Sequence, residues 1–109
     1  MVDLVRPAEL LSWFAQEGDA RPLVLDVREP WEYAIARIDG SVNMPMSGLG
    51  AIWRDALDPA RETVVICHHG GRSFQVALFL ERAGFAQVAN LDGGINAWAE
   101  EVDPAMPRY

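Results

Sequence analysis

Mostly apolar segments of strand length alternate along the chain with segments of helical spacing. The four strand-like segments are residues 23–25, 42–44, 63–66 and 88–89. Continuous apolar runs, such as Thr63-Val64-Val65-Ile66, are typical of strands that are covered on both faces. The pattern therefore predicts a sheet that is buried between other elements.

Helices are expected between these strands. They begin at Pro7, at Pro30, near Gly48, at Phe74 and at Ile95. Proline suits a first helical turn because the amide that it lacks has no partner there. The helix from Pro7 is expected to end near Gly18.

The apolar faces of two of these helices are also predicted. The first helix is expected to bury Leu10, Leu11, Trp13 and Phe14. The helix over 74–83 is apolar almost all round, which predicts that it is largely buried. Gly84 is expected to end it in a left-handed conformation.

The alternation of strands and helices predicts an α/β fold. Such alternation favours a mostly parallel sheet with helices on both faces. With 109 residues, half of them apolar, the chain is expected to form a single domain over 1–109 with its own core.

Charge and composition exclude several functions. The net charge is −7, which argues against nucleic acid and anionic membranes as partners. All nine basic residues are arginine, so Schiff-base and P-loop lysine chemistry are excluded. A single cysteine forms no internal disulfide, and no apolar run is long enough for a membrane span or a signal peptide. A soluble cytoplasmic protein is expected.

The chemistry is expected between the strand 63–66 and the following helix. The connecting segment is Cys67-His68-His69-Gly70-Gly71-Arg72-Ser73. The first amides of a helix lack partners inside it and favour an anion. Gly70 and Gly71 allow close backbone approach, and Arg72 adds a cation with a planar fork of donors. Cys67 at the strand end is therefore expected to be a nucleophile with a favoured thiolate form.

These residues also have purely structural explanations. A single cysteine is often only a small buried apolar residue. His68 and His69 are the only histidines, and with no further cysteine or histidine available a zinc site is not expected. We interpret them as loop-shaping residues that add positive charge below neutral pH. No cofactor and no metal are predicted.

Asp26 and Arg28 form a second candidate position. They follow the strand 23–25, and ligands bind at the carboxyl ends of parallel strands. A role in binding substrate is thus expected. The alternative is that Asp26 caps the next helix and Arg28 pairs with a surface carboxylate.

Several motifs in order resemble the rhodanese homology domain in its single-domain form. They are Leu25-Asp26-Val27-Arg28 with Glu32-Tyr33, Asn43-Met44-Pro45, the segment Cys67 to Ser73, and Leu91-Asp92-Gly93-Gly94 with Trp98. The resemblance implies a five-stranded, mostly parallel sheet. One departure is Ala36-Arg37-Ile38, where many members carry Gly-His-Ile; this is expected to alter packing or the pocket rim.

The resemblance also implies an activity, a thiosulfate sulfurtransferase reaction. The Cys67 thiolate would take the outer sulfur of a small anionic donor such as thiosulfate, forming a persulfide, and pass it to a thiol, cyanide or a protein. Residues 68–73, Asp26 and Arg28 would bind substrate. The ending, Val102 to Tyr109, is similar to rhodanese domains fused to enzymes that activate sulfur-carrier proteins, which keeps a protein acceptor open.

Two rival functions follow from the same residues. A cysteine phosphatase or arsenate reductase also sets a thiolate below a loop ending in arginine, but with five intervening residues where this chain has the four from His68 to Gly71. A non-catalytic binding module of this fold usually loses the cysteine, which is present here.

Overall fold

A parallel β-sheet of five strands organises the protein. The computed structural model describes residues 2–15 and 21–109. The strands lie in the order β1-β5-β4-β2-β3, and every pair is parallel. Their bounds are Asp3–Val5, Leu23–Asp26, Val42–Asn43, Thr63–Ile66 and Val88–Leu91 for β1 to β5. The α/β class and the five-stranded sheet are confirmed.

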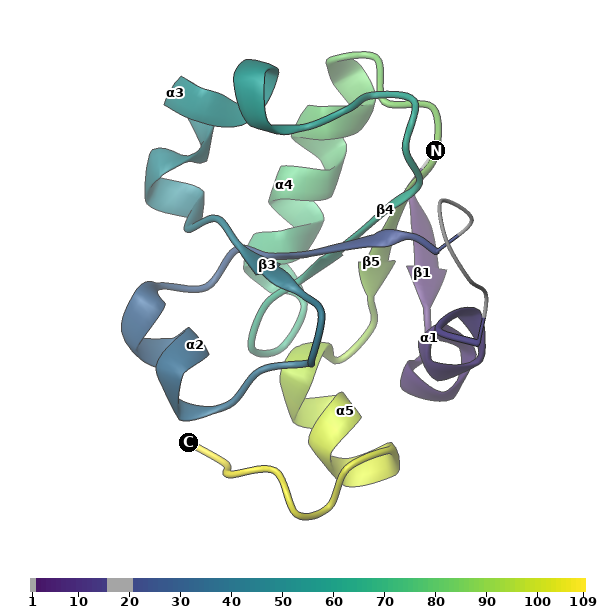
Figure 1. Cartoon of the computed structure of the whole chain (residues 1–109), viewed down its shortest axis with the longest axis vertical. Helices are drawn as coiled ribbons and strands as arrows, with labels where there is room; N and C mark the ends of the chain where they lie inside the picture. The colour runs from purple at the N-terminus through teal and green to yellow at the C-terminus, as the bar shows by residue number, and fades with distance from the viewer. Residues whose placement is uncertain (1, 16–20) are drawn as a thin grey trace.

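In the described part of the chain, four helices lie between consecutive strands and a fifth follows β5. They are α1 (Pro7–Trp13), α2 (Pro30–Ile35), α3 (Met46–Ala56), α4 (Gly71–Arg82) and α5 (Gly94–Glu101). Figure 1 shows α3 and α4 in the upper half of the view and α1, α2 and α5 in the lower half. Among the described residues, no helix is both long and apolar enough to cross a membrane.

Two apolar clusters show that both faces of the sheet are covered. Val64 and Ile66 belong to the cluster that contains Leu10 of α1 and Trp98 of α5. Val65, which points the other way from the same strand, belongs to the cluster packed by α3 and α4. The prediction of helices on both faces is therefore confirmed.

Strand β1 was not predicted from the sequence. It has only three residues, of which Val5 alone is buried, so no run of apolar residues marks it. It adds to the edge of the sheet beside β5 with the register Val5 to Leu91. Pairing along the sheet, rather than its own sequence, defines this strand.

The first helix differs in part from its prediction. It ends at Trp13, and Gly18 lies outside the described residues. Leu10 is fully buried as expected, whereas Leu11 is 48% exposed, so its predicted burial was wrong. Phe14 follows the helix and packs partly buried against Trp98.

Helix α4 is also less buried than predicted. Val76, Ala77 and Leu80 form its buried face, but Phe74 and Phe79 are 40% and 43% exposed. The helix covers only one face of the sheet, so its opposite side meets solvent even where it is apolar. Gly84 has φ +106°, which confirms the expected left-handed end.

The chain after α5 returns across the carboxyl end of the sheet. In Figure 1 it passes below α5 and finishes beside α2. The ring of Tyr109 meets that of Trp31 edge-on, with centroids 6.0 Å apart. The same ring stacks on His68, which places the last segment next to the loop that follows β4.

Candidate functional site

Cys67 lies where the central strand β4 ends, and its sulfur has two hydrogen-bond donors within reach. The Gly70 amide donates to Sγ at 3.1 Å, and the Ser73 hydroxyl lies 3.3 Å from Sγ. The residue is only 1% exposed. Both donors are placed to stabilise a negative charge carried by the sulfur.

The loop backbone is turned so that its amides face away from α5. The Ile95 amide donates to the Cys67 carbonyl at 2.8 Å, and the Asn96 amide donates to the His68 carbonyl at 3.1 Å. In a planar trans peptide the N–H points opposite to the C=O. The amides of His68 and His69 therefore point away from α5.

Glycine at position 94 makes this contact possible. A Cβ there would lie 2.5 Å from the carbonyl oxygens of both Cys67 and His68, and the residue has φ +62°. Only glycine avoids that overlap. The Gly93-Gly94 turn therefore lets the start of α5 pack closely against the cysteine loop and fix its conformation.

The loop ends at the amino terminus of α4. Gly70 has φ +111°, and its carbonyl accepts hydrogen bonds from Asn90 and Ser73, each at 3.2 Å. The first three helical amides, of Gly71, Arg72 and Ser73, have no partners within the helix. Cys67 is thus placed at the positive end of the α4 dipole.

Ser73 and Asn90 form a polar pair beneath the sulfur. Both residues are buried, and the Ser73 hydroxyl is within hydrogen-bond distance of the Asn90 side-chain oxygen as well as of Cys67 Sγ. A hydroxyl has one hydrogen, so it donates to only one of these acceptors at a time. A negative charge on the sulfur favours donation to Cys67.

Arg72 is held by a carboxylate rather than pointing freely into solvent. Its Nη1 and Nη2 donate to Oε1 and Oε2 of Glu32 at 2.6 and 2.9 Å. The hydrogen bonds from Arg72 lower the pKa of Glu32 to about 2, although burial opposes this. The same bonds raise the pKa of Arg72, and the nearby Cys67 contributes in the same direction.

Asp26 and Arg28 form an ion pair that is closed to solvent. Both are 0% exposed, and Arg28 Nη2 donates to Asp26 Oδ2 at 2.7 Å. Burial disfavours the charge on Arg28, but hydrogen bonds with Asp26 and Tyr109 outweigh it and raise the pKa. Arg28 therefore pairs with a buried carboxylate, not with a surface one. The predicted role of both residues in binding substrate stays a prediction.

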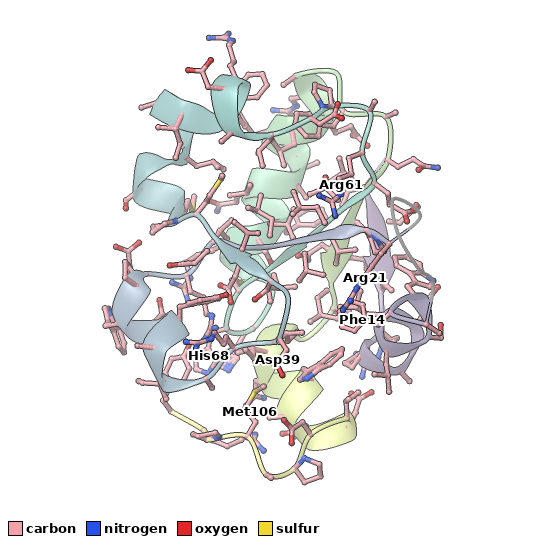
Figure 2. All side chains as sticks on the ribbon, viewed as in Figure 1. Phe14, Arg21, Asp39, Arg61, His68 and Met106 are labelled. Carbon is pink, nitrogen blue, oxygen red and sulfur yellow. The ribbon has the colours of Figure 1, made fainter. Side chains whose placement is uncertain are left out.

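The two histidines are stacked one on the other. The His68 and His69 ring centroids are 4.1 Å apart, and the other face of His68 stacks on Tyr109 at 4.2 Å. Figure 2 shows His68 near α2, on the side where the C-terminal segment returns. Burial, and after it the neighbouring His69, lower the pKa of His68 below its ordinary value.

The structure thus brings together most of the predicted site and adds residues that sequence reasoning missed. Cys67 and Arg72 gather at the carboxyl end of the sheet, as do the residues between them. Glu32, Asn90 and Tyr109 were not predicted as site residues. Asn90 had one signal, because it is a polar residue inside a buried strand.

The chain belongs to the rhodanese family. The model of the rhodanese-like domain matches residues 7–101. A solved rhodanese-related protein from Thermoplasma volcanium is 34% identical, with a TM-score of 0.81 over 92% of this chain and 93% of that one. The resemblance seen in the sequence is therefore confirmed.

Relatives of this chain carry sulfurtransferase names. It is 37% identical to the thiosulfate sulfurtransferase GlpE of Pseudomonas fluorescens, over 84% of this chain and 81% of GlpE. It is 33% identical to the probable adenylyltransferase/sulfurtransferase MoeZ of Mycobacterium tuberculosis, over 96% of this chain and 26% of MoeZ. The chain spans less than a third of the length of several larger relatives that it matches.

Proposed function

We propose that the protein is a sulfurtransferase that carries a sulfur atom as a persulfide on Cys67. The observation that supports this most directly is the environment of Sγ, which accepts from the Gly70 amide and lies beside the Ser73 hydroxyl. The same donors can hold the anion of a thiolate or of a persulfide. The sulfurtransferase names of its relatives point the same way.

The first half of the reaction takes sulfur from an anionic donor. With thiosulfate, the Cys67 thiolate attacks the outer sulfur, a new S–S bond forms, and the donor's S–S bond breaks. Sulfite leaves with the bonding electrons, and the negative charge remains on the terminal persulfide sulfur. Arg72 lies beside the loop and is our candidate for orienting the donor, since a guanidinium matches oxyanion geometry.

The second half passes the sulfur to an acceptor from outside the chain. The nucleophilic acceptor attacks the terminal sulfur, and the Cys67 thiolate is regenerated. The chain has only one cysteine, so it cannot release the persulfide by forming an internal disulfide. Cyanide or a thiol serves as a test acceptor.

A protein acceptor is a second candidate for this half-reaction. The relative MoeZ is named adenylyltransferase/sulfurtransferase, and this chain covers only 26% of it. The C-terminal segment lies next to the cysteine loop. A protein that docks there to accept the sulfur would therefore contact this segment. Transfer of labelled sulfur to a purified acceptor protein, compared with transfer to cyanide, tests this candidate.

Phosphate transfer is disfavoured by the size of the loop. Four residues separate Cys67 from Arg72, where cysteine phosphatases place five. A shorter loop leaves space for one sulfur atom above the thiolate more readily than for a tetrahedral phosphate. Hydrolysis of p-nitrophenyl phosphate faster than thiosulfate turnover would reverse this assignment.

Intact mass spectrometry after exposure to thiosulfate tests the proposal. The wild-type chain should gain one sulfur atom, peptide mapping should place it on Cys67, and cyanide should remove it. Cys67→Ser should gain no sulfur and show no turnover while keeping the wild-type circular dichroism spectrum. A variant with near wild-type turnover would rule out Cys67 as the carrier.

A further inference from the structure

Tyr109 contacts three separate parts of the site. Its hydroxyl accepts a hydrogen bond from Arg28 Nη1 at 2.9 Å and donates one to Glu32 Oε2 at 2.9 Å. Its ring stacks on His68 at an interplanar angle of 16°. One side chain therefore links a buried ion pair, the partner of Arg72 and the cysteine loop.

The hydroxyl completes the set of donors around Glu32. Oε2 accepts from Arg72 Nη2 and from Tyr109, and Oε1 accepts from Arg72 Nη1 and from the Glu29 amide. A two-point pair requires the carboxylate and the guanidinium to share a plane. Groups that fix the plane of the carboxylate therefore also fix the guanidinium.

We propose that Tyr109 is a positioning residue for the donor half of sulfur transfer, because its hydroxyl fixes the Glu32 carboxylate that orients Arg72 beside Cys67. This inference rests on the proposed function. The residue acts through Glu32 and Arg72 rather than on the reacting sulfur itself. Its hydroxyl also bridges the side chains of Arg28 and Glu32.

The direction of these bonds is set by the charges on either side. The guanidinium of Arg28 contains only hydrogen-bond donors, so it must donate to the Tyr109 hydroxyl. The hydrogen of that hydroxyl is then left to donate to Glu32. Burial raises the pKa of Tyr109, which keeps that hydrogen in place at neutral pH. Arg28 is itself held by Asp26 and by the Ala36 carbonyl, so it gives the hydroxyl a fixed support.

The ring has a separate effect on the loop. His68 lies between His69 and Tyr109, and its carbonyl is bound by the Asn96 amide. Stacking of its ring and the hydrogen bond to its carbonyl together restrict His68, the residue next to Cys67. Removing the ring should therefore add to the effect of removing the hydroxyl.

The test compares the two half-reactions in two tyrosine variants. Tyr109→Phe removes only the hydroxyl, and Tyr33→Phe is the matched control because Tyr33 donates to the Ser41 carbonyl at 2.8 Å. In a two-step transfer, kcat/KM for each substrate reports its own half-reaction. Tyr109→Phe should lower kcat/KM for thiosulfate roughly threefold to tenfold and leave kcat/KM for cyanide unchanged, in keeping with one hydrogen bond.

Each outcome decides the inference. Equal losses for thiosulfate and cyanide would mean a merely structural role, and kinetics like those of Tyr33→Phe would mean no role; either overturns it. Tyr109→Ala, which also loses the ring, should be at least as impaired with thiosulfate, and wild-type donor kinetics would overturn the inference as well. If the wild-type chain gains no sulfur from thiosulfate, the proposed function fails instead.

Discussion

The guanidinium of Arg72 and the carboxylate of Glu32 form a two-point ion pair although the residues are 40 positions apart. The Glu32 side chain is 5% exposed and that of Arg72 is 38% exposed. The pair thus has a buried negative end in α2 and a partly open positive end in α4. The pair connects the start of α4, and with it the cysteine loop, to α2.

Glu32→Gln should destabilise the protein measurably. The amide has one acceptor oxygen instead of two, so its NH₂ group would face one of the two Arg72 nitrogens. We expect the free energy of unfolding to fall by about 2 kcal/mol, because a buried charge-assisted pair is broken. Urea denaturation measures this. Glu100→Gln breaks an exposed pair with Arg108 and should cost less than about 1 kcal/mol; equal losses in both variants would contradict the prediction.

The same carboxylate predicts how stability depends on pH. The folded-state pKa of Glu32 is lowered to about 2, below its ordinary value of 4.5. A lowered folded-state pKa contributes stability that is present above the ordinary value and is lost as the pH falls towards the folded value. The gap in unfolding free energy between wild type and Glu32→Gln should therefore narrow from pH 5 towards about pH 2. Denaturation at several pH values checks this, and a constant gap would refute it.

Arg72→Ala should impair the use of an anionic donor. It removes the cation and the fork of donors at the loop, so kcat/KM for thiosulfate should fall by about tenfold or more. The value for cyanide should change less. Arg108→Ala, which removes an arginine that pairs with Asn96 and Glu100, is the control. An unchanged Michaelis constant for thiosulfate would show that Arg72 does not bind the donor.

Local sequence predicted the strand, the loop and the helix that surround Cys67. The strand 63–66, the glycine pair and the helix that follows are consecutive, so their arrangement around Cys67 follows from rules that act over a few residues. The same rules placed α2 at Pro30. Residue type, spacing and chain order were sufficient wherever the partners are close in sequence.

The remaining features depend on contacts between distant segments. Tyr109 meets Glu32 across 77 positions, and β1 becomes a strand only by pairing with β5. The complete burial of Arg28 is likewise invisible in the sequence, because arginine is ordinarily exposed. Its neutralising partners become apparent only when the fold places them around it.

Gly94→Ala should disrupt the cysteine loop. A Cβ at this position would meet the Cys67 and His68 carbonyl oxygens at 2.5 Å, in addition to the strain of φ +62°. Gly84→Ala separates the two effects, since φ is +106° there and no atom lies within 4 Å. We expect Gly84→Ala to cost about 1 to 2 kcal/mol and Gly94→Ala clearly more, with loss of thiosulfate turnover only in Gly94→Ala. Thermal denaturation and activity assays check both; equal effects would contradict a role for the close contact.

Ser73→Ala should slow the reaction of Cys67 with iodoacetamide. The hydroxyl is one of two hydrogen-bond donors within reach of Sγ, so without it the sulfur loses a group that stabilises negative charge. We expect the rate at neutral pH to fall about threefold to tenfold, as for the loss of one hydrogen bond. Ser12→Ala is the control, because that hydroxyl donates to the Glu9 carbonyl at the surface. A wild-type rate in Ser73→Ala, or an equal fall in Ser12→Ala, would contradict a role for the Ser73 hydroxyl at the sulfur.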